Sequence, residues 1–179
     1  MSHVLCFCTA AYLHCHLTCQ SPLESTRLSS LRKLEHSHRL CLKLMQSLPR
    51  RTPTNFTLSA VNAVPMETVI GHKKLNFLGP LCNLPCSYMT KRVFNIRLTH
   101  CLNLDNQSLG FIPDINRILT KYALLHALDR YLSDGVFLSK CAWKWIIYGK
   151  SIQRSNSEHF HECVENYPSA LHWYCVLMM

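Results

Sequence analysis

The sequence predicts an all-α protein, an irregular multi-helix domain, and three observations support this fold class. Glycine is scarce, with only 5 among 179 residues. Alternating polar and apolar runs, which are typical of strands, are few, whereas apolar residues recur at intervals of three and four in several segments. Proline residues and an Asp-Gly pair separate these segments. We therefore expect helices over Leu23–Leu48, Glu67–Leu78, Tyr88–Leu102, Pro113–Ser133 and Ser139–Ser151.

The first predicted helix is basic and amphipathic. Ser21, Pro22 and Glu24 form a start signal, because serine can cap free backbone N–H groups, proline fits the first turn and glutamate can reach back. Pro49 marks the end, since proline disfavours the helical conformation of the residue before it. The apolar stripe of this helix consists of Leu31, Leu34, His38, Cys41, Met45 and Leu48.

The next two predicted helices combine apolar residues with charged ones. Pro80 is expected to end the helix Glu67–Leu78 early, because proline breaks the backbone hydrogen-bond pattern. Lys73 and Lys74 are expected to be exposed on that helix. The apolar side of the helix Tyr88–Leu102 is expected to consist of Val93, Ile96 and Leu98.

The last two predicted helices begin and end at sequence signals. Pro113 fits a first turn, and Asp114 suits the positive end of a helix dipole. Gly135 follows Asp134 as a stop signal, and Ser139 is a candidate cap for the final helix. Helical spacing directs one set of large apolar residues toward a common core: Phe111, Leu119, Tyr122, Trp143 and Ile147.

We expect residues 22–179 to form one basic helical domain and residues 1–21 to be a poorly ordered segment outside its core. The apolar run Val4–Leu13 is too short to span a membrane, and it lacks the positively charged region of a signal peptide. The eleven cysteines are an odd number with irregular spacing, so we expect reduced thiols rather than a disulfide framework. These features favour an intracellular location and no membrane partner.

Cysteine and histidine residues raise the alternative of a small zinc-binding protein. Cys82 and Cys86, followed by His100 and Cys101, have the spacing closest to that of a metal site. Adjacent residues such as His100 and Cys101 rarely both reach one tetrahedral ion, and a cluster within residues 6–19 lacks a Cys-x-x-Cys pair. We therefore expect cysteines packed in helices, and we predict neither a metal site nor a cofactor.

The positive charge is concentrated in one part of the chain. The formal net charge is +9, and the segment Arg27–Arg97 contains twelve lysines and arginines but only Glu35 and Glu67 as acidic residues. Such a segment suits an anionic partner, with RNA or DNA first, and the alternative is a solvated basic surface. The candidate nucleic-acid-binding residues are Arg32, Lys33, Arg39, Lys43, Arg50, Arg51, Lys73, Lys74, Lys91 and Arg92.

Several segments resemble one known family. The run Leu34–Thr52, LEHSHRLCLKLMQSLPRRT, resembles a segment downstream of the polymerase palm in the reverse-transcriptase polyproteins of non-LTR (LINE-type) retrotransposons. The runs Lys74–Pro85 (KLNFLGPLCNLP), Gly110–Asp114 (GFIPD) and Gly135–Lys144 (GVFLSKCAWK) resemble later segments of the same region. The resemblance covers roughly Glu24–Trp173, with Pro80 and Leu138 as departures from the family pattern.

No catalytic motif accompanies this resemblance. The Tyr-x-Asp-Asp sequence that supplies the metal-binding carboxylates of a polymerase is absent, and so are glycine-rich phosphate loops and a Gly-x-Ser-x-Gly motif. We therefore expect no enzymatic activity and no small-molecule substrate. The resemblance implies a retroelement-derived fragment, at most an auxiliary helical module that binds nucleic acid. A decayed remnant without present activity is the alternative.

Overall fold

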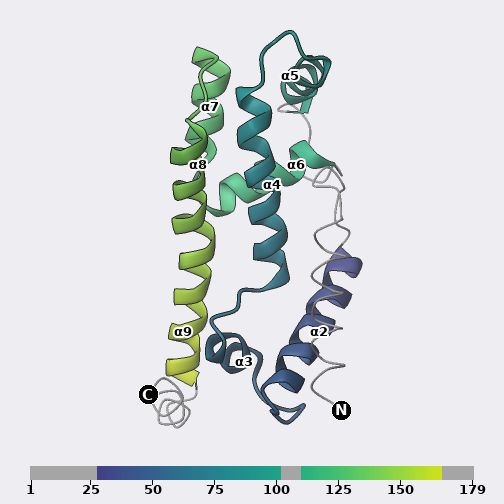
Figure 1. Ribbon diagram of the computed structural model, residues 1–179, viewed down its shortest axis with the longest axis vertical. Coiled ribbons are helices and arrows are strands. Elements are labelled where there is room, and N and C mark those ends of the chain that lie inside the picture. The colour runs from purple at the N-terminus through teal and green to yellow at the C-terminus, as the bar shows by residue number, and fades with distance from the viewer. Residues whose placement is uncertain (1–27, 102–109, 167–179) are drawn as a thin grey trace. The chain divides into compact units, whose positions relative to one another are not determined.

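The computed structural model describes residues 28–101 and 110–166, which form helices joined by turns and contain no strand (Figure 1). The all-α prediction is therefore confirmed for this part of the chain. The described residues divide into two compact units, residues 28–69 with 152–166 and residues 70–101 with 110–151. The N-terminal segment 1–21, which we expect to lie outside the core, is not among the described residues.

The first unit contains α2 (Leu28–Met45), α3 (Thr54–Ala60) and α9 (Arg154–Asn166), and α3 contacts the other two helices (Figure 1). Helix α2 ends before Pro49, as predicted. Ser47 adopts a left-handed conformation with φ 54°, and the Leu48 N–H donates to the Lys43 carbonyl at 2.8 Å. None of the helices predicted from the sequence covers the residues of α3.

Side-chain hydrogen bonds connect the elements of the first unit. Glu35 Oε2 accepts from the Met66 backbone N–H at 2.7 Å, and Gln46 Nε2 donates to the Thr57 carbonyl at 3.1 Å. The expected apolar stripe of α2 is only half-buried, and Met45 is exposed. Polar bonds therefore contribute to the position of α2 alongside apolar packing.

Helix α4 (Met66–Asn83) belongs to the second unit from Ile70 onward. The unit also contains α5 (Met89–Cys101), α6 (Phe111–Lys121), α7 (Leu125–Asp134), α8 (Lys140–Ile147) and most of the π-helix η1 (Tyr148–Gln153). Its hydrophobic core includes the predicted residues Leu119, Tyr122, Trp143 and Ile147, and Phe111 packs against them. The predicted packing is confirmed. Ser139 also caps α8, since its hydroxyl accepts from the Ala142 N–H at 3.3 Å.

Trp143 connects α8 to α4 in this core. The indole is 1% exposed, and its Nε1–H donates to the Leu75 carbonyl at 2.8 Å. Phe137 meets its ring edge to face, with centroids 4.9 Å apart, and Tyr131 meets Phe137 in the same way at 6.0 Å. A run of aromatic rings therefore links α8 to α7.

Helix α4 continues through Pro80 to Asn83, so the expected early end is wrong. Proline removes one N–H, which leaves the Asn76 carbonyl without its usual helical donor. Neighbouring carbonyls on α4 have side-chain donors, since Asn83 Nδ2 donates to the Gly79 carbonyl at 2.9 Å and Trp143 donates to that of Leu75. Packing in the second unit therefore outweighs the tendency of Pro80 to end the helix.

The predicted helix Pro113–Ser133 is two helices. Ala123 has a left-handed φ of 54°, and the Leu124 N–H donates to the Leu119 carbonyl at 2.8 Å, which closes the end of α6. The predicted apolar side of the helix near Tyr88–Leu102 is also partly wrong. Leu98 is buried together with Phe94 and Lys91, whereas Val93 and Ile96 are exposed.

Gly79 and Gly71 on α4 give a matched test of this packing. A Cβ at Gly79 would clash with the Trp143 ring, so Gly79→Ala should lower the free energy of unfolding by about 1–3 kcal/mol. A Cβ at Gly71 would make an ordinary 3.7 Å contact with Ile118, so Gly71→Ala should raise it by about 0.5–1 kcal/mol. Urea denaturation measures both, and equal effects of the two variants would contradict the packing described.

Candidate nucleic-acid interface

Four predicted cations of the first unit are exposed. Arg32 and Lys33 lie on α2, and Arg50 and Arg51 lie in the turn between α2 and α3. Their guanidinium and ammonium groups have no ion-pair partner among the described residues. They are therefore free to meet an anionic ligand.

Arg39 and Lys43 are engaged within the unit. Arg39 Nε donates to Glu35 Oε1 at 2.8 Å, and its side chain is half-buried. Lys43 Nζ donates to the Arg50 carbonyl at 2.9 Å. The Lys43 bond ties the end of α2 to the following turn, so Lys43 helps to place Arg50 and Arg51.

Glu35 is the only acidic residue in segment 28–66, and it does not oppose the exposed cations. One carboxylate oxygen accepts from Arg39, and the other accepts from the Met66 N–H. A carboxylate held by two donors inside the unit is a weak competitor for a phosphate-binding arginine. The local charge of α2 and its turn is therefore strongly positive.

Lys74 is buried, so its expected exposure is wrong. It is 3% exposed, and its Nζ lies 2.5 Å from Asp114 Oδ2 on α6. Arg117 Nη2 donates to the other oxygen, Oδ1, at 2.6 Å. A buried cation requires compensating interactions because its desolvation is costly, and Asp114 supplies them to Lys74. Lys74 thus links α4 to α6 rather than adding to a binding surface.

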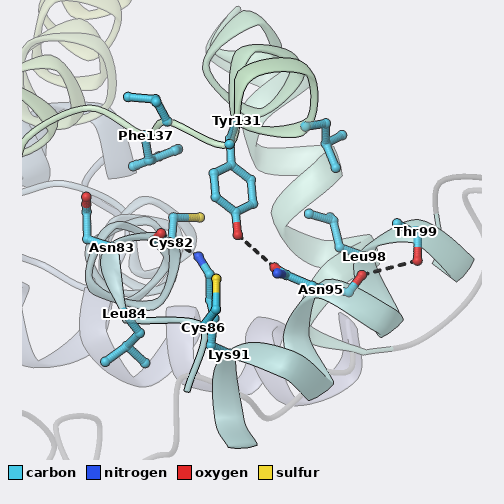
Figure 2. Close-up of a pocket in the computed structure, with 13 residues that line it drawn as sticks. Cys82, Asn83, Leu84, Cys86, Lys91, Asn95, Leu98, Thr99, Tyr131 and Phe137 are labelled. Carbon is cyan, nitrogen blue, oxygen red and sulfur yellow. Dashed lines mark hydrogen bonds between the residues drawn. The ribbon is translucent and has the colours of Figure 1, made fainter. Parts of the chain in front are cut away.

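Lys91 is likewise 3% exposed, although we expected it to extend the basic surface. Its Nζ donates to the carbonyls of Leu81 and Cys82 near the end of α4, and it lies 4.3 Å from the centroid of the Tyr131 ring (Figure 2). The carbonyl end of a helix dipole and an aromatic face both attract a cation, so Lys91 is buried without a carboxylate. Its role is structural.

The two remaining candidates differ in exposure. Arg92 is exposed on α5, whereas Lys73 is half-buried on α4 and has an interaction partner. The predicted set therefore separates into exposed cations, engaged cations and two buried lysines. The exposed members are Arg32, Lys33, Arg50, Arg51 and Arg92.

A pocket of about 530 Å³ lies beside Lys91, and Cys82 and Cys86 are among its lining residues (Figure 2). Burial raises the pKa of the Cys82 thiol to about 12, so this thiol is protonated at neutral pH and a poor zinc ligand. The Cys101 side chain and the cluster within residues 6–19 are outside the described part. Within that part, no three His, Cys, Asp or Glu residues are grouped as a metal site.

A second surface was not predicted from the sequence. Cys141, Lys144, Trp145 and Tyr148 line a hollow in the second unit together with His72 and Asn76 of α4. The spacing of three, four and seven residues after Cys141 is a signal that could have identified it, because this spacing places residues on one helical face. In the segment from Cys141 to Tyr148, we assigned only Trp143 and Ile147 from the sequence, as core residues.

No helix in the described ranges is both long enough and apolar enough to cross a membrane. Comparisons with protein-family models, with curated proteins and with solved structures each find no match.

Asp114 and Lys74 allow a test of the buried pair. Asp114→Asn leaves the Lys74 ammonium buried without a counter-charge, so it should lower the free energy of unfolding by about 3 kcal/mol. Lys74→Met should cost clearly less, because Asp114 retains Arg117. Denaturant titration measures both variants, and a larger loss for Lys74→Met would contradict this arrangement.

His72 gives a pH-dependent prediction. Burial lowers the pKa of His72 below 6.5, so the unfolded chain binds the proton more readily. The stability that the neutral ring contributes is complete above about pH 6.5 and is lost as the pH falls toward the folded pKa. His72→Gln should therefore lose less stability than the parent between about pH 7.5 and 5.5. The exposed His126→Gln is the control, and identical pH profiles for the parent and His72→Gln would refute the prediction.

Proposed function

We propose that the chain is a non-catalytic helical module that binds nucleic acid and derives from the region downstream of the palm in a LINE-type retrotransposon reverse transcriptase. The origin rests on the sequence resemblance. The binding activity rests on one observation, the exposed cations of α2 and its turn, which no free carboxylate of that segment opposes.

The geometry of these cations supports contacts with phosphate rather than with bases. Arg32 and Lys33 are neighbours on one helix, while Arg50 and Arg51 are neighbours in the turn that Lys43 ties to the end of the same helix. Arginine presents several N–H donors that match phosphate oxygens. Contacts of this type give affinity with little sequence preference.

The surroundings of Asp114 support the non-catalytic part of the proposal. Phosphoryl transfer by two metal ions needs carboxylates that are grouped and available to the ions. Asp114 is instead engaged by Lys74 and Arg117, while Asp129 and Asp134 lie on α7.

Removal of the four exposed cations tests the proposal. Arg32, Lys33, Arg50 and Arg51 would be replaced by alanine, and binding to labelled RNA and DNA would be measured at several salt concentrations. Each lost phosphate contact should reduce the magnitude of the slope of log affinity against log salt by about one unit. We expect a shallower slope and weaker binding, with sequence preference unchanged.

The control variant removes the same charge elsewhere, by Arg97→Ala, Lys121→Ala, Arg130→Ala and Arg154→Ala. It should retain a steeper slope than the test variant. Equal slopes would mean that only net charge matters, and the proposed location would be wrong. Absence of binding by the parent protein would favour the alternative, a remnant without present activity.

A further inference from the structure

The helical segment formed by α8 and η1 has a buried side and a side with large exposed aromatic residues. Trp143, Ile147 and Ser151 follow one another at intervals of four residues and are buried. The opposite side of the same segment faces solvent. It carries Cys141, Lys144, Trp145 and Tyr148.

Two large aromatic side chains are exposed next to one another on this face. Trp145 is 76% exposed and Tyr148 is 54% exposed. They are three residues apart on a helical segment, which places them on the same side. Together with His72 and Asn76 of α4, they line an open hollow of about 580 Å³. Exposed aromatic surface beside a hollow is typical of a binding site.

Hydrogen bonds fix the position of this face relative to α4. His72 Nδ1 and Ser151 Oγ are 3.1 Å apart, and Ser151 Oγ donates to the Ile147 carbonyl at 2.6 Å, where the helix widens into η1. Trp143, two residues before Trp145, also attaches this segment to α4, because its indole N–H donates to the Leu75 carbonyl. Trp145 and Tyr148 therefore project from a rigid frame, so binding would cost little ordering entropy.

The charge around the hollow is positive. Lys140, Lys144 and Lys150 are exposed, and residues 135–157 include no aspartate or glutamate. None of the three lysines forms an ion pair with a described residue. Lys144 lines the hollow itself, and Lys140 and Lys150 lie nearby along the same helical segment, so an anionic ligand would meet positive charge without displacing a carboxylate of residues 135–157.

We propose that this face binds single-stranded nucleic acid, with bases stacked on Trp145 and Tyr148 and phosphates near Lys140, Lys144 and Lys150. The inference deepens the proposed function and rests on it. Exposed rings stack with bases only when those bases are unpaired, and interspersed lysines match the backbone charge. An apolar partner would leave the lysine charges unmatched, whereas a nucleic-acid strand matches both features.

The test compares Trp145→Ala and Tyr148→Ala with Tyr88→Ala, which removes another exposed tyrosine, directly before α5. Fluorescence anisotropy would measure binding to single-stranded RNA, single-stranded DNA and duplex DNA. Each test variant should weaken single-strand binding by about 5- to 100-fold. The salt slope should remain unchanged, because stacking releases no counterions. Tyr88→Ala should behave like the parent.

Lys144→Ala provides the second arm. It should reduce the magnitude of the single-strand salt slope by about 0.7 if it loses one phosphate contact. The comparison of single-stranded RNA with single-stranded DNA identifies the groups that are recognised. Equal affinities would mean that backbone charge and stacking suffice, whereas a preference for RNA would indicate contacts to the 2′-hydroxyl. Both results are consistent with the proposal.

The inference is overturned if the parent binds in a salt-dependent way with equal affinity for duplex and single strand, and if Trp145→Ala leaves the single-strand affinity unchanged. That result would leave the proposed function intact, with its location on α2. Failure of the parent to bind any of the three nucleic acids would overturn both proposals. Circular dichroism would verify that the exposed-site variants are folded.

Discussion

The contact between Trp143 and α4 determines how the second unit is built. Its indole occupies the space above Gly79 and donates a hydrogen bond to the Leu75 carbonyl, while Phe137 packs against its ring. A larger residue at Gly79 would displace the indole. Because Trp143 and Ile147 point into the core, Trp145 and Tyr148 on the same helix must point out of it. The candidate stacking surface is therefore a direct consequence of the core packing.

Much of the fold could be predicted because the signals were local. The end of α2 before Pro49, the Ser139 cap and the shared core of Leu119, Tyr122 and Trp143 follow from nearby residues and helical spacing. The misses depended on distant contacts. Pro80 lies inside α4, where Trp143 and Asn83 donate to carbonyls of the preceding turn. The break at Ala123 requires a left-handed residue, and no glycine marks it in the sequence.

The binding residues were less predictable than the fold, because a lysine has the same sequence signature whether it is buried or exposed. Lys74 has its partner 40 residues away at Asp114, and Lys91 is held by backbone carbonyls that no sequence pattern reveals. The structure thus divides a uniform basic segment into cations that stabilise the fold and cations that are available. It also adds the lysines and aromatic rings of α8 and η1, which are interspersed with core residues in the sequence.

Photo-cross-linking tests the central claim, that nucleic acid meets specific exposed residues rather than a diffuse positive charge. A single-stranded oligonucleotide with photoreactive bases would be irradiated with the intact chain, and modified peptides would be located by mass spectrometry. We predict that base cross-links concentrate on the peptide with Trp145 and Tyr148, and that competing duplex suppresses them less than unlabelled single strand does. Cross-links spread evenly over exposed side chains, including Tyr88 directly before α5, would contradict the account.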